Sequence, residues 1–459
     1  MHPLRALLLG ALASLAEATL QIVPGATWTT SNNEHLQAHG PGVIKVDSTY
    51  YLIGEDKTNG SAFQNVNCYS SQNLVEWTYE GALLSRTAEA GDLGPNRVVE
   101  RPKVVYNART RQYVLYLHID SSNYGEAKVG VATGTSVCGT YAYRGSFRPQ
   151  GRQSRDMGLF VDDDGAGYLL TEDRESGLRI LRLADDYLSV AADTHLWSDS
   201  IESPALVRLA GRYYVFGSKL TGWDPNDNVY STATALAGPW SAWQTFAAAG
   251  SKTYTSQTSF VLPVGGDANG SAPTGALYLG DRWVSRNLMA STYVWLPLRI
   301  AGATVSLDDA ESWVPDLGAA SGARAKPAET SYEGEAAAYG GGARDVQCGA
   351  CSGGVAAGYL GGPAAAAGTV TFTGVRSDAD ARTTVRVRYA NGDSAPRYAR
   401  VRVNGGAPAT LAFLPTAGAV SASTLHADLR AGAQNEIVFE GVGDGRWGPD
   451  IDRLIVPVQ

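Results

Sequence analysis

The sequence is poor in charge, in methionine and in long apolar runs. Of its 459 residues only 18% are charged and three are methionine. No segment beyond the N-terminal region is apolar enough to cross a bilayer, so we expect no membrane partner. The net charge of −8 disfavours a nucleic-acid partner, because proteins that bind polyanions concentrate lysine and arginine. This composition excludes a coiled coil and bulk disorder, and it favours a neutral ligand.

Aromatic residues and glycine are abundant instead, with 23 tyrosines, 10 tryptophans and 53 glycines, which favours strands and turns. A short aromatic strand pattern recurs five times at intervals of about 45 to 65 residues, which suits a four-stranded propeller blade. The copies are residues 50–54, 113–116, 168–171, 213–217 and 277–280. We therefore predict an all-β fold with a five-bladed β-propeller. An irregular β-sandwich with coincidental tyrosine-rich strands is the alternative.

The N-terminus has the pattern of an export signal. His2 and Arg5 precede the apolar run of residues 7–13, and Ala16-Glu17-Ala18 supplies a small-x-small cleavage site. The apolar run is too short for a membrane anchor. We predict a signal peptide over residues 1–18 and a secreted, extracellular protein, in which the four cysteines are candidates for disulfides.

The composition changes after Trp313. Residues 316–330 show no apolar periodicity and are predicted to form a flexible linker after a propeller domain at 19–315. Residues 331–459 alternate strand patterns with Asn, Gly and Asp turns, which predicts a separate, jelly-roll-like β-sandwich domain.

Two glutamates share one local context. Glu100 and Glu202 each lie just ahead of a proline and a predicted blade strand. Corresponding strands of successive blades converge on a propeller axis, so these carboxylates are candidates for one pocket. Paired carboxylates with a water between them are what glycoside hydrolysis requires. The alternative is that each glutamate caps a turn or forms a surface ion pair.

These motifs resemble glycoside hydrolase family 43. The resemblance rests on the five repeats, on Ile201-Glu202-Ser203-Pro204 and on the opening segment 42–52. Family members are inverting propeller enzymes with a general acid Glu and a general base Asp on the first blade. Here Gly40 stands where that Asp is expected. This departure, with segments 154–157, 255–259 and 293–298, resembles the exo-acting galactan 1,3-β-galactosidases over residues 20–315.

The resemblance implies a role for each of several residues. Glu202 matches the general acid, and Glu100 matches a neighbouring carboxylate that would raise its pKa. Gln257 takes the place of the base, acting as an imidic-acid tautomer. The alternative is that Gln257 binds a sugar hydroxyl and the base is Glu100 or water itself. Matching positions for galactose hydroxyls are Glu55, Tyr124, Asp156 and Thr221, with Trp223 as an aromatic face. No catalytic cofactor and no metal ligands are expected in this domain.

The C-terminal segment resembles carbohydrate-binding module family 35 through residues 332–336, 351–354 and 447–453. That family implies a structural calcium site, matched by Glu333, Glu335 and Asp452, whose alternative is plain surface charge. Tyr359, Asn391, Asp393 and Asp450 match loop positions that bind galactosyl or uronic sugars. Cys348 and Cys351 favour a local disulfide over a zinc half-site, whereas Cys68 and Cys138 either pair or stay free.

The sequence thus predicts a secreted, monomeric exo-β-1,3-galactanase. It would release galactose by inversion from the non-reducing end of β-1,3-galactan, the backbone of arabinogalactan, with calcium as a structural ion. An arabinofuranosidase or β-xylosidase on the same scaffold is the nearest alternative, and the missing base Asp counts against it. A non-catalytic galactan-binding lectin, with Gly40 as the lost base, is the other.

Overall fold

The computed structural model describes residues 19–266, 272–364 and 367–458. The predicted signal peptide at 1–18 lies outside these residues. Within them the regular structure is almost entirely strand, so the all-β prediction is confirmed, and α1 (Lys252–Thr255) is the one α-helix that they contain. None of the described helices is long and apolar enough to span a bilayer.

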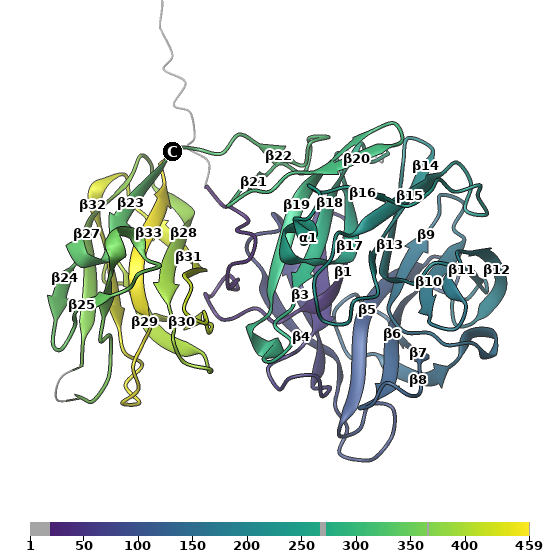
Figure 1. The fold of residues 1–459 in the computed structure, drawn as a ribbon, viewed down its shortest axis with the longest axis horizontal. Coiled ribbons are helices and arrows are strands. Elements are labelled where there is room, and N and C mark those ends of the chain that lie inside the picture. The colour runs from purple at the N-terminus through teal and green to yellow at the C-terminus, as the bar shows by residue number, and fades with distance from the viewer. Residues whose placement is uncertain (1–18, 267–271, 365–366, 459) are drawn as a thin grey trace, which may run out of the picture.

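Residues 39–307 form five consecutive four-stranded antiparallel sheets, each built from strands adjacent in the chain (Figure 1). The first two sheets are β1 (His39–Val46), β2 (Thr49–Glu55), β3 (Asn65–Ser71), β4 (Thr78–Ser85), and β5 (Arg97–Asn107), β6 (Gln112–Ser121), β7 (Lys128–Gly134), β8 (Ala142–Phe147). The third is β9 (Met157–Val161), β10 (Gly167–Asp173), β11 (Gly177–Leu183), β12 (Val190–Leu196). The last two are β13 (Ile201–Leu209), β14 (Arg212–Lys219), β15 (Val229–Ala233), β16 (Gln244–Thr245), and β17 (Gln257–Val264), β18 (Gly275–Arg282), β19 (Thr292–Ala301), β20 (Thr304–Leu307).

The first strands of these sheets contact one another in cyclic order, β1 with β5, β5 with β9, β9 with β13, β13 with β17, and β17 with β1. The five aromatic repeats of the sequence are the second strands, β2, β6, β10, β14 and β18. Their apolar side chains are buried between neighbouring sheets, which is why the same strand pattern recurs once in each sheet.

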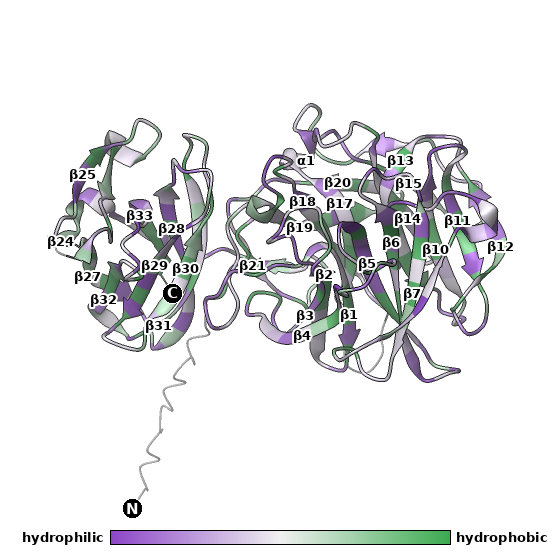
Figure 2. Cartoon of the chain, turned by 90° about the horizontal axis from the view of Figure 1, so that it is seen from below, coloured by the Kyte–Doolittle hydropathy of each residue, from purple (hydrophilic) through white to green (hydrophobic). Residues whose placement is uncertain are grey.

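Residues 329–457 form two further sheets. The first contains β23 (Glu329–Glu333), β25 (Arg344–Gln347), β26 (Val355–Gly358), β28 (Ala381–Ala390), β31 (Ser421–Leu429) and β33 (Asp450–Pro457). The second contains β24 (Ala338–Gly340), β27 (Thr369–Ser377), β29 (Arg397–Val403), β30 (Ala409–Phe413) and β32 (Gly432–Glu440). Apolar side chains alternate with polar ones along their strands (Figure 2), and both sheets contribute to one buried core.

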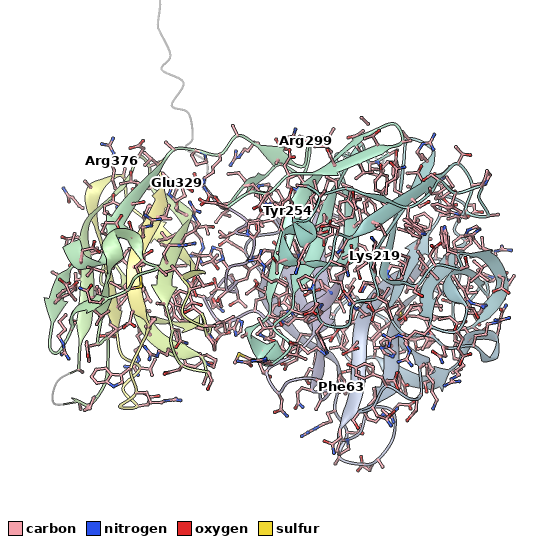
Figure 3. All side chains as sticks on the ribbon, in the orientation of Figure 1. Phe63, Lys219, Tyr254, Arg299, Glu329 and Arg376 are labelled. Carbon is pink, nitrogen blue, oxygen red and sulfur yellow. A yellow bond between two sulfur atoms is a disulfide. The ribbon has the colours of Figure 1, made fainter. Side chains whose placement is uncertain are left out.

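The segment expected as a flexible linker is partly a hairpin. β21 (Val314–Pro315) pairs with β22 (Ala323–Arg324), and Leu317 packs against the core of the fifth sheet. A Cβ on Gly275 would lie 1.8 Å from the Ala320 carbonyl oxygen, so the glycine there permits close approach of two backbones. Beyond the hairpin, Glu329 at the start of β23 forms ion pairs with Lys326 and Arg386 (Figure 3). Residues 314–324 are therefore packed against the fifth sheet, and a linker over the rest of the segment stays a prediction.

All four cysteines are paired. Cys68 on β3 bonds to Cys138, which follows β7, so this disulfide links the first two sheets. Cys348 and Cys351 form the local disulfide that the sequence favoured over a zinc half-site.

Candidate active site

The candidate site lies at the N-terminal ends of the first strands of the five sheets, which we call the inner strands. In four of the five sheets the pairing register shifts there, between His39 and Gly42 on β1 and at the corresponding places on β5, β13 and β17. Three of the shifts contain a residue with positive φ directly before a proline: Gly40 (56°), Arg101 (55°) and Ser203 (54°). Such irregularities turn side chains out of the regular ladder. At these places side chains of β5, β13 and β17 contact one another, as Gln257 does with Glu202 and Arg101.

Glu202 is 6% exposed at the start of β13. Its Oε1 accepts a hydrogen bond of 2.9 Å from Gln257 Nε2, and its Oε2 lies 3.8 Å from Arg174 Nη2. Burial and the charges of Asp156 and Glu172 raise the pKa of Glu202 to about 8, against the opposing charges of Arg101 and Arg174. Glu202 therefore retains its proton near neutral pH, as a general acid must.

The carboxylates that raise the pKa of Glu202 are principally Asp156 and Glu172, and not Glu100 as expected. Asp156 directly precedes β9. It forms an ion pair with Arg101 Nη2 at 2.8 Å and accepts a 2.5 Å hydrogen bond from Ser203 Oγ. Burial opposes ionisation of Asp156, but Arg101 and Ser203 lower its pKa overall, so it stays charged. A permanent negative charge beside Glu202 is thereby held in place.

Glu100 has hydrogen-bonding partners other than those of Glu202 and Asp156. Its Oε1 accepts hydrogen bonds from Lys57 Nζ (3.3 Å) and Tyr124 Oη (3.0 Å), and its Oε2 lies 3.5 Å from His118 Nδ1. Burial alone would raise the pKa of Glu100, but Lys57 and His118 hold it well below its usual range. Glu100 is thus a fixed anion and an acceptor.

Glu55 occupies the space next to Gly40. Its Oε1 accepts a 2.8 Å hydrogen bond from the Arg101 backbone N–H, and its Oε2 lies 2.6 Å from Lys57 Nζ. A Cβ on Gly40 would lie only 2.1 Å from Glu55 Oε1. The position of the expected base Asp is therefore filled by a carboxylate from the neighbouring strand β2.

The amide of Gln257 makes four side-chain hydrogen bonds. Nε2 donates to Glu202 Oε1 and to Ser218 Oγ (3.0 Å), while Oε1 accepts from Arg101 Nη2 (2.6 Å) and Trp283 Nε1 (2.9 Å). Since a primary amide has two N–H donors and two acceptor lone pairs, its hydrogen-bonding capacity is used in full.

Trp223 and Thr221 lie on the loop after β14. Trp223 is 44% exposed and packs edge-on against Trp283, with ring centroids 5.8 Å apart, and it shares a small cavity with Gln257. The Thr221 hydroxyl is exposed, but it donates to the Asp224 carbonyl and accepts from Asn226 within its own loop. Trp223 thus presents a free aromatic surface beside the site, whereas the Thr221 hydroxyl is engaged in the turn.

A larger cavity at the other ends of the inner strands is lined mainly by apolar residues such as Val104, Leu206 and Leu262. It contains none of the carboxylates described above, so it is not the site of this chemistry.

One cluster in the described part of the chain has metal-ligand geometry. Carboxylate or ring atoms of Glu100, His118 and Asp156 lie within 4.8 Å of one another. His118 Nε2 already lies 2.9 Å from Asp120. Burial would lower the pKa of His118, but Asp120 and Glu100 raise it to about 9. This imidazolium supplies positive charge between the carboxylates, which is a poor environment for a second cation.

In the C-terminal module the predicted sugar ligands have different surroundings. Tyr359 is 37% exposed and lies edge-on to the exposed Trp447, with the Arg344 guanidinium 3.4 Å from its ring centroid. Asp393 pairs with Arg397 at 2.8 Å, and Asp450 lies 4.0 Å from the same guanidinium.

Asn391 is fully buried, and its side chain bonds only to backbone groups, of Ala395, Phe413 and Asp393. It shapes the loop and has no free group for a ligand. Tyr359, Asp393 and Asp450 are therefore the predicted residues that remain near the surface of the module.

Two of the three predicted calcium ligands, Glu333 and Asp452, lie next to Arg453. Glu333 Oε1 is 3.7 Å from Arg453 Nη1, and Asp452 Oδ2 is 3.9 Å from its Nε. Asp452 Oδ1 also accepts a 2.7 Å hydrogen bond from the Ser352 backbone N–H. Glu333 Oε2 and Glu335 Oε2 are buried oxygens without a hydrogen-bond partner, which suits oxygen donors for Ca²⁺.

Several residues of the site were not predicted from the sequence. Three of them contact a predicted residue directly, namely Arg101, Trp283 and Lys57. The fourth, Glu172, raises the pKa of Glu202. Arg101 lies in the same residue-before-proline context that drew attention to Glu100 and Glu202, so that signal was available. Glu172 and Trp283 lie on other strands and loops with no distinguishing motif.

Comparison with known proteins defines the class of this protein. A family model described as "Glycosyl hydrolases family 43" matches residues 35–259. The solved exo-β-1,3-galactanase of Phanerochaete chrysosporium, bound to galactose, is 38% identical with a TM-score of 0.66, covering 95% of this chain and all of that one. The chain therefore belongs to glycosyl hydrolase family 43 and is a glycoside hydrolase.

Two more distant proteins are also similar to this chain. An exo-β-1,3-galactanase from Clostridium thermocellum is 25% identical with a TM-score of 0.62, covering 94% of this chain and 99% of that one. A curated protein of Aspergillus fumigatus, described as a probable arabinan endo-1,5-α-L-arabinosidase B, is 27% identical over 173 residues, which are 35% of this chain and 44% of that protein. The match thus spans less than half the length of the curated relative.

The C-terminal segment matches a different family model from the one expected. Residues 369–456 match the model described as "Alpha-galactosidase, CBM13 domain". The motifs that suggested family 35 lie mostly before residue 369, in the short elements around β23 to β26, so the matched strands carry little of that pattern. The segment is a carbohydrate-binding module, and its assignment to family 35 is unconfirmed.

Proposed function

We propose that this protein is an exo-acting galactan 1,3-β-galactosidase that releases galactose from the non-reducing end of β-1,3-galactan with inversion. The observation that carries the proposal is the contact between Glu202 and Gln257 at a site where Gly40 has no side chain. Solved exo-β-1,3-galactanases support it, including a Glu-to-Gln variant of the Phanerochaete enzyme bound to β-1,3-galactotriose.

The proposed architecture is a five-bladed β-propeller over 19–315, whose blades are the five sheets, followed by a jelly-roll-like β-sandwich over 331–459. The cyclic contacts of β1, β5, β9, β13 and β17 support the ring. The shared core of the last two sheets supports the sandwich.

In the proposed mechanism, Glu202 gives its proton to the glycosidic oxygen as the bond from that oxygen to the anomeric carbon breaks. A water attacks the anomeric carbon from the opposite face. Gln257 exchanges one of its four hydrogen bonds for a bond that orients this water, and the proton that the water loses passes through Gln257 to solvent. Asp156 keeps the pKa of Glu202 high, and Glu55, Glu100 and Tyr124 are the fixed polar groups that would bind galactose hydroxyls.

Product analysis tests this function. The full chain is incubated separately with linear β-1,3-galactan and with α-1,5-arabinan, and the released sugars are followed by ¹H NMR from the first minutes. We expect galactose from the galactan alone, initially as the α-anomer, because inversion of a β-linkage gives that product. Release of arabinose from the arabinan would favour another specificity of the family, and binding without any release would favour a lectin.

The remaining assignments are proposals of the same kind. The protein is proposed to be secreted as a monomer, with a mature N-terminus at Thr19, which N-terminal sequencing and light scattering of the exported protein would test.

The module is proposed to bind galactan through the surface around Tyr359, Asp393 and Asp450. Loss of affinity for polymer in Tyr359→Ala, with unchanged rates on short oligosaccharides, is the expected result.

Calcium is proposed as a structural ion of the module, held by Glu333, Glu335 and Asp452. Since an ion bound only to the folded state stabilises it, chelation should lower the melting temperature of the full chain, and added Ca²⁺ should restore it. The same chelation should leave Glu335→Gln unchanged. An unchanged melting temperature in the wild type would remove these three residues as ligands.

A further inference from the structure

We propose that Arg101 and Trp283 are positioning residues of the hydrolysis, which hold the Gln257 amide with its oxygen as an acceptor and turn its nitrogen toward Glu202. The inference rests on the proposed function for its kinetic test, which uses β-1,3-galactobiose. Its spectroscopic test depends on the geometry alone.

The two groups come from different sheets and converge on one atom. Arg101 lies on β5, and its Nη2 is 2.6 Å from Gln257 Oε1. Trp283 follows β18, and its indole N–H reaches the same oxygen over 2.9 Å. Each can donate a hydrogen bond, and neither nitrogen can accept one.

These two donors fix the orientation of the amide. Rotating the amide by half a turn would place the NH₂ group against Arg101 Nη2 and Trp283 Nε1, so that four N–H groups would face one another without an acceptor. The observed orientation instead places Nε2 between Glu202 Oε1 and Ser218 Oγ, which both accept. The nitrogen is thus the atom of Gln257 that faces the general acid.

The same contacts bear on the chemical form of Gln257. An imidic acid carries a proton on the oxygen, and that hydroxyl would point at two groups that can only donate. Donors at this distance favour a form in which the oxygen carries negative charge rather than a proton. Any proton that Gln257 takes from water therefore arrives at Nε2, and Nε2 must release one of its own two protons in the same exchange.

Both positioning groups are themselves held in place. Arg101 is 5% exposed. Its guanidinium forms an ion pair with Asp156 at 2.8 Å and lies 5.7 Å from the ring centroid of Trp283. Trp283 also packs edge-on against Trp223. A change at the indole N–H therefore alters the hydrogen bond to Gln257 without leaving the ring free to move.

The kinetic test uses Trp283→Phe in the full chain with β-1,3-galactobiose as substrate. We expect kcat to fall by about ten- to a hundredfold, because a small displacement of a reacting group has that effect, while KM stays within about twofold. The basic limb of the pH profile, which reports Glu202, should not move. Trp240→Phe is the matched control, since its indole also donates to one acceptor, the Leu236 carbonyl, away from the site. A raised KM with unchanged kcat would make Trp283 a sugar-binding residue and overturn the proposal.

A spectroscopic test needs no substrate. The indole ¹H–¹⁵N signal of Trp283, identified by its loss in Trp283→Phe, should shift in Gln257→Leu, whereas that of Trp240 should not. An unshifted Trp283 signal would overturn the proposal whatever the enzyme cleaves. If the wild type releases no galactose but the signal shifts, the proposed function fails and the positioning of Gln257 stands.

Discussion

Glu202 is a strong example of a residue whose chemistry depends on neighbours distant in the sequence. Asp156 and Glu172 belong to the preceding sheet, yet together with burial they keep Glu202 protonated. Arg101 comes from β5, where it forms an ion pair with Asp156 and donates a hydrogen bond to Gln257. At the scale of the residue, the protonation of Glu202 depends on this chain of charges.

Replacing Glu202 by Gln should remove the transferable proton while keeping the shape of the side chain. We expect kcat on galactobiose to fall at least about a hundredfold, the scale of general acid catalysis. Affinity for the same sugar, measured by calorimetry, should be nearly unchanged. A variant with substantial activity would exclude Glu202 as the acid.

As the proposed general acid, Glu202 should set the alkaline limit of activity through its pKa. Because the acid must be protonated, kcat/KM should fall as pH rises through about 8. Glu172→Gln removes one of the negative charges that raise this pKa, so the fall should begin at lower pH. Glu175→Gln, a change in an exposed neighbouring carboxylate, is the control. Coincident pH profiles for the two variants would contradict this electrostatic account.

At the scale of the strand, the irregular starts of β1, β5 and β13 bring the site together. Each has a residue with positive φ before a proline, and the register shift turns side chains away from the regular ladder. On β1 the residue is Gly40, and Glu55 of β2 takes the space beside it. The carboxylate thus comes from the second strand of the sheet instead of the first.

Restoring an aspartate at position 40 should therefore not restore a conventional base. In Gly40→Asp the new Cβ meets Glu55 Oε1, and the backbone must hold φ at 56°. We expect activity on galactobiose to fall by about tenfold or more, since a displaced Glu55 disturbs the site. Gly302→Asp, at φ 58° in an open turn, is the control and should keep wild-type activity. A more active Gly40→Asp enzyme would show that the site accepts a carboxylate there.

At the scale of the whole molecule, the N-terminal segment holds the module against the region of the five four-stranded sheets. Thr27 exchanges backbone hydrogen bonds with Ala422 and Thr424, so this segment continues the sheet beyond β31. Arg382 on the module pairs with Glu76 and donates to the Ser31 carbonyl. The two parts therefore have a fixed relative position.

The buried pair between Asn33 and His426 offers a test of this contact. The Asn33 side chain donates to the His426 carbonyl (3.1 Å) and accepts from its N–H (2.7 Å). Asn33→Gly keeps the positive φ of 63° but removes both bonds. We expect a loss of about 1 to 3 kcal/mol in the free energy of unfolding, or a split calorimetric transition.

The exposed neighbour provides the matched variant, because Asn32→Gly removes a similar side chain outside the contact. Equal melting behaviour of the two variants would mean that the module docks weakly.

The sequence by itself determined the strand repeat, the local Cys348–Cys351 disulfide, the family and the glutamates before prolines. These are local patterns, in which spacing and residue type directly reflect a strand, a turn or a motif. Only the tertiary structure decided that Asp156 and Glu172 act on Glu202, that Glu55 fills the space at Gly40, and that Leu317 packs against the fifth sheet. Such contacts join residues far apart in the chain, and the distances, burial and charges that govern them exist only once the sheets have packed together.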